Sequence, residues 1–170
     1  MTTPDDELLI RVARATDEDG LTRLDAAAWT PASGFPSVIE RVNDPFFTFF
    51  TEDSPPGAHL VAEAGGRLLG YIRVRPVTTL RENAHVLGIM GLAIAPDARR
   101  RGVAAALLAA AEQYTRERGG NKLSLRVLST NEPALRLYER SGFRREGTLR
   151  GEFCIHGRYV DDIIMAKHLT

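Results

Sequence analysis

The stretch Ala95-Pro-Asp-Ala-Arg-Arg-Arg-Gly-Val-Ala-Ala-Ala-Leu-Leu108 decides the fold of this chain. It predicts the end of a strand, an arginine-rich turn and the start of a long helix. Arg99, Gly102 and Ala104 fit the pattern Gln/Arg-x-x-Gly-x-Gly/Ala. The first N–H groups of a helix lack intrahelical acceptors and carry partial positive charge, so they attract anions. Because Gly102 and Ala104 carry little bulk, the backbone can approach a ligand closely, and we expect a pyrophosphate at this turn.

Other phosphate-binding motifs are missing from the sequence. Neither G-x-G-x-x-G nor G-x-x-x-x-G-K-[ST] occurs, which argues against a Rossmann dinucleotide site and a P-loop. On its own, the segment also fits a simpler interpretation, in which a buried strand, a loop and a helix carry a solvated arginine cluster.

The composition is that of an ordinary globular protein. The 170 residues include 44% hydrophobic and 26% charged residues, which suits a single domain over 1–170 with an ordered core of about 7–168. Lys+Arg and Asp+Glu both number 22, so the neutral balance argues against nucleic-acid binding. One cysteine, a polar N-terminus and the lack of a long apolar run favour a cytoplasmic protein that does not bind membranes. An enzyme or a sensor of a small molecule fits better than a scaffold.

Hydrophobic periodicity and turn residues predict a mixed α/β order. Strands are expected at 8–14, 59–64, 67–77, 84–94, 122–128, 143–155 and 158–168, and helices from Thr16, the expected N-cap, to about Trp29, and at 37–42, 102–118 and 131–142. Gly65-Gly66 and His156-Gly157 are the expected hairpin turns. The helix at 102–118 makes a crossover between the fourth and fifth strands, which favours a parallel pair there.

A second motif, Asn131-Glu-Pro-Ala-Leu-Arg-Leu-Tyr-Glu-Arg-Ser-Gly-Phe143, follows in the same chain. It resembles the Asn-x-x-Ala-x-x-x-Tyr-x-x-x-Gly-Phe segment of the GCN5-related N-acetyltransferase (GNAT) superfamily, whose members hold the pyrophosphate of acetyl-CoA at a turn like that of Arg99 to Ala104. The resemblance is strong from about 84 to 165 and weak in the N-terminal third. It implies a mostly antiparallel central sheet with one splayed parallel strand pair and helices on both faces. The pantetheine arm of the cosubstrate would lie between the splayed strands.

The resemblance also implies which residues bind acetyl-CoA, and it implies no metal. Pantetheine amides would pair with the backbone of Leu92, Ala93 and Ile94, and an N–H near Leu92 would stabilise the oxyanion. The residues expected around the pyrophosphate are Arg99, Arg100, Arg101, Gly102, Val103, Ala104 and Ala105. Asn131 is expected to cap its helix, to hydrogen-bond pantetheine, or to do both.

Tyr138 is expected to protonate the departing thiolate. A tyrosine, with a pKa near ~10, stays a donor at neutral pH beside a thiol whose pKa is near ~8.5. The alternative is that Tyr138 only packs its helix on the sheet. Many members of the superfamily use a glutamate on the fourth strand as the base, but this strand, from His85 to Ile94, carries no carboxylate. His85 is a candidate base, although a buried structural histidine is the more frequent case, and Glu82 or a water chain are further candidates.

The acceptor is expected to be a small primary amine such as an amino acid, and the enzyme a homodimer. Trp29, Phe35, Arg73, Glu152 and Tyr159 are candidate pocket residues, each equally consistent with surface or core. In a small-molecule enzyme, the loop 30–57 and the last hairpin should close the acceptor site. A protein N-terminus or lysine is the rival acceptor, and a non-catalytic acyl-CoA sensor is the rival of another class. Cys154 is expected to be core filler, not a nucleophile.

Overall fold

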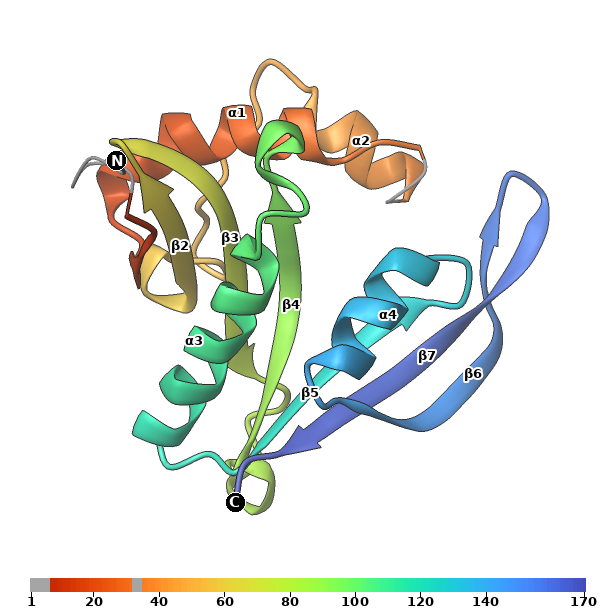
Figure 1. Ribbon diagram of the computed structural model, residues 1–170. Coiled ribbons are helices and arrows are strands. Elements are labelled where there is room, and N and C mark those ends of the chain that lie inside the picture. Colours follow the sequence, from red (N-terminus) through yellow and green to blue (C-terminus); the bar gives the residue numbers. More distant parts are fainter. Residues whose placement is uncertain (1–6, 32–34) are drawn as a thin grey trace. The chain divides into compact units, whose positions relative to one another are not determined.

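The computed structural model describes residues 7–31 and 35–170. They form two compact units, one made of the chain up to Val74 with Gly91–Ala111 and the other of Arg75–Met90 with Glu112–Thr170. Strand β4 (Val86–Ile94) and helix α3 (Val103–Glu117), which are labelled in Figure 1, each contribute to both units. The expectation of a single domain over 1–170 stays a prediction, and residues 1–6 and 32–34 of that range lie outside the described residues.

The first unit contains an antiparallel meander. Strand β1 (Leu9–Val12) pairs with β2 (His59–Ala64), and β2 pairs with β3 (Arg67–Pro76), with β4 next in order. Gly65 and Gly66 join β2 to β3 with φ angles of 57° and 71°. Two consecutive residues with positive φ are what a tight type I′ hairpin requires, which explains the glycine pair.

Helix α1 (Glu18–Ala28) begins later than the sequence suggests. Thr16 is not its N-cap, because residues 15–17 form a 3₁₀ turn and Asp17 precedes the helix. The Asp17 carboxylate accepts the Arg14 N–H at 2.7 Å and pairs with the Arg11 guanidinium at 2.8 Å. These contacts hold the chain in place where α1 begins, which is the role that an N-cap side chain has in many helices.

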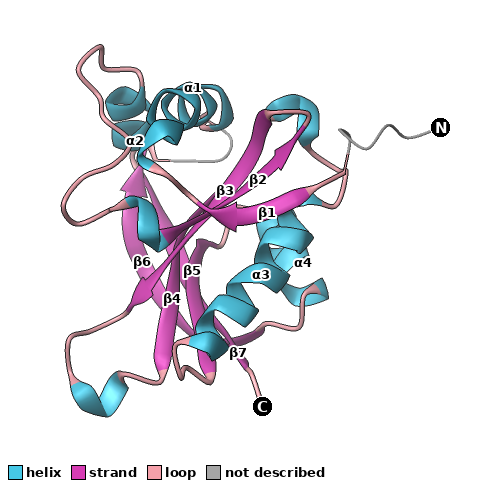
Figure 2. Ribbon diagram, turned by 90° about the vertical axis from the view of Figure 1, so that its left-hand side faces the viewer, coloured by secondary structure: helices cyan, strands magenta, loops and turns pink. Residues whose placement is uncertain are grey.

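Helices cover both faces of the sheet in the first unit (Figure 2). The Tyr71 hydroxyl of β3 donates to Asp25 of α1 at 2.6 Å. A Cβ added to the preceding residue, Gly70, would lie 3.3 Å from Leu107 Cδ1 of α3. Since successive side chains of a strand point to opposite faces, α1 and α3 lie on opposite sides of β3.

Gly70 is needed where β3 and β4 approach closely. An added Cβ would lie 2.8 Å from the Ala93 carbonyl oxygen and 2.7 Å from Ile94 Cδ1. Because a backbone oxygen is hard to displace, Gly70→Ala should lower the free energy of unfolding by about 1–3 kcal/mol, as measured by urea denaturation. Gly57→Ala is the control, because a Cβ there meets nothing within 4 Å. A Gly70→Ala protein as stable as the control would contradict this close approach.

The second unit contains β5 (Lys122–Leu128), α4 (Glu132–Arg140), β6 (Arg144–Ile155) and β7 (Arg158–His168). Its strand order is β4-β5-β7-β6, in which β4 and β5 run parallel and the other pairs are antiparallel. The parallel ladder has four pairs, from Val86↔Lys122 to Ile89↔Leu125, and ends there although both strands continue. The described residues thus contain seven strands, one parallel pair and four α-helices, which confirms the expected α/β class.

Strands β1, β3, β4 and β6 differ from the sequence prediction by one or two residues at an end, and the reasons are plain for β4 and β6. Strand β4 starts at Val86, two residues after the predicted start, because Ala84 and His85 form a turn. Strand β6 starts at Arg144, and Phe143 before it is fully buried and packs edge-on against Tyr138. Gly142 has a φ of 91°, so it turns the chain from α4 into this buried position.

Candidate functional site

The turn before α3 has an unusual backbone and lies within the first unit. Residues 96–98 form a 3₁₀ turn, Arg99 is extended, and Arg100 and Gly102 have φ angles of 61° and 80°. A Cβ on Gly102 would meet no atom within 4 Å, so the space beside it is open. The turn thus has two residues with left-handed backbone directly before the helix.

This backbone exposes a row of N–H donors. Those of residues 101–105 donate to no acceptor among the described residues, and the first donor of the helix is Ala106 N, 3.0 Å from Gly102 O. Adjacent right- and left-handed residues form a concave nest of N–H groups, which binds anions. With the dipole of a helix of 15 residues behind it, the nest fits a diphosphate group.

The three arginines of this turn differ in their surroundings. Arg99 Nη2 donates to the carbonyl of Ala28, the last residue of α1, at 2.9 Å. Arg100 and Arg101 are exposed and make no hydrogen bond or ion pair with a described residue. Arg99 therefore ties the turn to the end of α1, whereas the other two arginines have free guanidinium groups for phosphate oxygens.

The last part of β4 lies beyond the parallel ladder with β5, whose final pair is Ile89↔Leu125. Ala95 N donates to Leu69 O of β3 at 2.8 Å. Because backbone groups alternate along an extended chain, the N–H groups of Ile94 and Leu92 are directed to the edge away from β3. The sequence predicts that these N–H groups hydrogen-bond the pantetheine amides and, at Leu92, stabilise the oxyanion.

The second motif lies in the second unit and builds α4. The Asn131 side chain accepts the N–H of Ala134 at 3.4 Å, so Asn131 is the N-cap. Tyr138 is 8% exposed, and its ring centroid lies 5.9 Å from that of Phe143. Burial raises the pKa of Tyr138 to about 12, so its hydroxyl remains protonated at neutral pH. This hydroxyl donates to no described residue and is available to another acceptor.

The structure changes the surroundings expected for the candidate bases. His85 lies outside β4, in an exposed turn of the second unit, and is not a buried structural histidine. Its carbonyl oxygen accepts the N–H groups of Asn121 and Lys122 at 3.0 and 3.2 Å. Glu82 is also exposed, in a short 3₁₀ turn. A role of His85 as the base stays a prediction.

Three of the suggested acceptor residues belong to the first unit. Trp29 Nε1 donates to Asp25 at 2.7 Å, and Arg73 Nη2 donates to the carbonyl of Asp53 at 2.6 Å. Phe35 precedes α2 (Pro36–Val42), which lies in the suggested closing loop 30–57, and residues 32–34 of this loop lie outside the described part.

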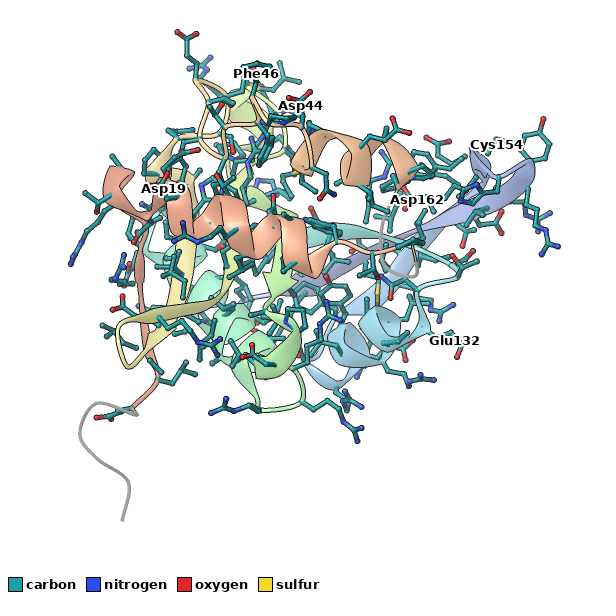
Figure 3. All side chains as sticks on the ribbon, turned by 90° about the horizontal axis from the view of Figure 1, so that it is seen from above. Asp19, Asp44, Phe46, Glu132, Cys154 and Asp162 are labelled. Atoms are coloured by element: carbon teal, nitrogen blue, oxygen red, sulfur yellow. The ribbon has the colours of Figure 1, made fainter. Side chains whose placement is uncertain are left out.

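The other two suggested acceptor residues lie on the hairpin of β6 and β7. Glu152 pairs with Arg126 at 3.1 Å, and Tyr159 is 80% exposed. Cys154 is exposed on β6, so the expectation of a small core filler is wrong (Figure 3). The His156-Gly157 turn forms as predicted, with φ angles of 50° and 75°.

The buried carboxylate of Asp25 was not predicted from the sequence. Asp25 is 5% exposed and occupies an apolar-face position of α1, together with Leu21, Leu24 and Ala28. Both Tyr71 and Trp29 donate to its Oδ1. The sequence does contain a signal for this site, because an aspartate stands at a helix position where the hydrophobic periodicity expects an apolar residue. A carboxylate buried at such a position needs hydrogen-bond partners.

Residues 7–31 and 35–170 contain neither a cluster of metal ligands nor a candidate membrane span. These residues contain no group of three or more His, Cys, Asp or Glu side chains that could hold a metal ion. They also contain no helix long and apolar enough to cross a membrane.

Comparison with known proteins identifies the family. The model of the acetyltransferase (GNAT) family matches residues 19–143. The chain belongs to the GNAT family. It is an acetyl-CoA-dependent N-acetyltransferase, as the turn before α3 and the α4 motif lead one to expect.

Curated relatives of this acetyltransferase act on different acceptors. An N-alpha-acetyltransferase of Sulfurisphaera tokodaii is 29% identical over 154 residues, which cover 85% of this chain and 84% of the relative. A mycothiol acetyltransferase of Acidimicrobium ferrooxidans is 33% identical over 132 residues, which cover 75% of this chain but only 40% of the relative. The acetyltransferase thus spans less than half the length of that relative.

Solved structures share the fold along nearly the whole acetyltransferase. A ribosomal-protein-alanine N-acetyltransferase from Brucella melitensis has a TM-score of 0.72 and 26% identity, and covers 95% of this chain and 99% of its own. A putative acetyltransferase from Salmonella typhimurium, solved with its cofactor acetyl-CoA, has a TM-score of 0.75 and 18% identity, and covers 96% of this chain and 95% of its own.

Proposed function

We propose that this acetyltransferase transfers the acetyl group of acetyl-CoA directly to the α-amine of a small molecule such as an amino acid. The observation that carries the proposal is the row of N–H groups at residues 101–105 that donate to no described residue and so offer a diphosphate a site. In a direct transfer both substrates are bound at once, and no acyl group rests on Cys154.

The backbone of β4, Asn131 and Tyr138 each have a role in this reaction. The free edge of β4 would pair with the pantetheine amides, and the Leu92 N–H would stabilise the oxyanion as it develops. Asn131 would add a side-chain contact to pantetheine beside its capping bond. Tyr138 would protonate the leaving thiolate, because its raised pKa of about 12 keeps it a donor.

A protein N-terminus is the second candidate acceptor. It is favoured by the names of two similar proteins, the N-alpha-acetyltransferase and the ribosomal-protein-alanine N-acetyltransferase. Both candidates present an α-amine, whose pKa of about 8 leaves more free amine at neutral pH than a lysine side chain with a pKa near ~10.4. The expected homodimer and cytoplasmic location stay predictions.

The test is the release of coenzyme A thiol from acetyl-CoA in the presence of different amines. L-Alanine, L-alanine amide, an alanine-initiated tetrapeptide and Nα-acetyl-lysine amide separate the acceptor classes. We expect turnover with the free amino acid or its amide to exceed that with the tetrapeptide. The reverse order would assign a protein N-terminus, and turnover confined to the lysine derivative would contradict an α-amine acceptor. Binding of acetyl-CoA with no turnover on any amine would favour the sensor.

A further inference from the structure

A buried carboxylate joins α1 to β3 in the first unit. Asp25 Oδ1 accepts the Tyr71 hydroxyl at 2.6 Å and the Trp29 indole N–H at 2.7 Å. Asp25 and Tyr71 are each 5% exposed. Two donors on one oxygen hold the carboxylate in a fixed orientation, and the Tyr71 oxygen keeps lone pairs that can accept another hydrogen bond.

The other oxygen of this carboxylate has a different environment. Asp25 Oδ2 makes no hydrogen bond to a described residue, and it is not among the fully buried polar atoms that lack a partner. It therefore retains contact with solvent. A proton that reaches the carboxyl group has a route to water that does not pass through Tyr71.

The Tyr71 hydroxyl lies next to the part of β4 assigned to the thioester. It is 3.9 Å from the position that a Cβ on Gly91 would occupy, and Gly91 directly precedes Leu92. No side chain of residue 91 stands between this hydroxyl and the strand. In the proposed reaction, the Leu92 N–H holds the thioester carbonyl. An amine that approaches this carbonyl from the face of β4 that carries the Tyr71 hydroxyl would pass over the Tyr71 oxygen.

We propose that Tyr71 and Asp25 form the relay that takes the proton from the acceptor amine. This rests on the proposed function. The ammonium N–H bond breaks and a bond to Tyr71 Oη forms, while the Tyr71 proton moves to Asp25 Oδ1. The electron pair left on nitrogen forms the bond to the thioester carbon, the carbon–sulfur bond breaks, and the thiolate takes a proton from Tyr138. Asp25 then loses its proton to water.

The charges around Asp25 suit a proton acceptor. Burial raises the pKa of Asp25, while the hydrogen bonds from Tyr71 and Trp29 and the charge of Arg41 on α2 hold the rise back. Burial raises the pKa of Tyr71 well above its usual range, so the phenol passes protons on without being ionised itself. The ring of His59 on β2 lies 6.0 Å from that of Tyr71, and burial and the nearby Arg73 lower its pKa, so His59 is neutral at neutral pH.

Trp29 gives a direct measurement of Asp25 ionisation that needs no acceptor. It is the single tryptophan of the chain, and its indole N–H donates to Asp25. We expect the Trp29 fluorescence of the acetyl-CoA complex to change between pH 4 and pH 8 with one midpoint above about pH 3.9. Asp25→Asn should abolish this transition. An emission that does not titrate, or that titrates equally in the variant, would overturn the relay whatever the acceptor is.

The second measurement is the pH dependence of kcat with L-alanine amide and the alanine-initiated tetrapeptide. In the wild type, kcat should rise with increasing pH, and the midpoint of this rise should equal the midpoint of the Trp29 fluorescence titration. The side chain of Asp25→Asn keeps an oxygen that accepts the hydrogen bonds from Tyr71 and Trp29, but it cannot take up a proton. In this variant, therefore, only acceptor amine that is already deprotonated can react. Its kcat at pH 6 should be about a hundredfold lower than that of the wild type and should approach it near pH 9, because the α-amine has a pKa of about 8. Tyr71→Phe should show the same pattern.

Asp19→Asn on the same helix is the matched control, because Asp19 is exposed and its substitution removes one charge from α1 (Figure 3). It should leave kcat and its pH profile unchanged. Because its folded-state pKa is raised, Asp25 contributes stability below about pH 3.9 that is lost as the pH rises through the folded pKa. A neutral asparagine should therefore keep the melting temperature at pH 7, so lost activity would not reflect unfolding.

The outcomes separate the relay from the proposed function. A wild type that turns over neither amine contradicts the α-amine acceptor, and the fluorescence titration then decides whether Asp25 can carry the proton. A wild type that turns over while Asp25→Asn keeps the wild-type pH profile overturns the relay and leaves the proposed function standing. A uniform loss of kcat at every pH would also overturn it, because it would show a merely structural role.

Discussion

Ala104→Glu is expected to weaken acetyl-CoA binding by about 10²–10³-fold while the protein stays folded. Ala104 is the second residue of α3, beside the free N–H groups of the turn. A carboxylate there repels a diphosphate at about 4–5 Å by roughly 3–4 kcal/mol at an effective dielectric constant of 20. The same carboxylate interacts favourably with the helix dipole, so the free energy of unfolding should not fall. Calorimetric titration and urea denaturation measure the two effects separately.

The control for this variant is Gln113→Glu, which also adds one negative charge. Gln113 is exposed on the same helix and lies nine residues after Ala104, which is roughly 13 Å further along the helix axis. The Kd of acetyl-CoA should change less than about threefold there, because charges more than a Debye length apart are screened. Equal Kd values for Ala104→Glu and the wild type would place the pyrophosphate elsewhere.

Tyr138→Phe is expected to lower kcat by about 10²–10⁴-fold, the usual contribution of a positioned general acid. The Kd of acetyl-CoA should stay the same, because the ring and its contact with Phe143 remain. Burial raises the pKa of Tyr138 to about 12, so its proton is present throughout the assay range. The wild type should accordingly show no loss of kcat from this group as the pH rises to 10. Stopped-flow measurement of thiol release gives kcat directly.

Tyr114→Phe tests whether any buried tyrosine hydroxyl on a helix has this effect. Tyr114 on α3 is also 8% exposed and has the Arg118 guanidinium over its ring. Its substitution should leave kcat within about twofold, because loss of a hydroxyl away from the chemistry affects stability and not the barrier. If Tyr138→Phe keeps the turnover of the wild type, Tyr138 only packs α4, and the acid must be sought elsewhere.

Local sequence patterns were sufficient for the element order and for both motifs. Gly65-Gly66 predicted a turn that requires two positive φ angles, and Gly102 predicted the open turn before α3. Asn131 predicted the N-cap of α4. Such features depend on the conformational freedom or hydrogen bonding of a few adjacent residues, so the chain encodes them at short range.

Burial and long-range partners could not be obtained in this way. Cys154 is exposed although it was expected to fill the core, and His85, a candidate base expected on the fourth strand, lies in an exposed turn, because solvent access depends on the elements that cover a residue. Arg99 belongs to the motif, yet its bond to Ala28 joins residues 71 positions apart.

By itself, the sequence determined that this chain folds as a GNAT acetyltransferase with an arginine-rich turn before α3. Only the tertiary structure decided which carboxylate stands near β4. Asp25 and Tyr71 are 46 positions apart, and neither residue belongs to a motif. Their pairing arises because α1 packs on the face of β3 that carries Tyr71. A hydrogen bond between distant residues follows from packing, which no local pattern encodes.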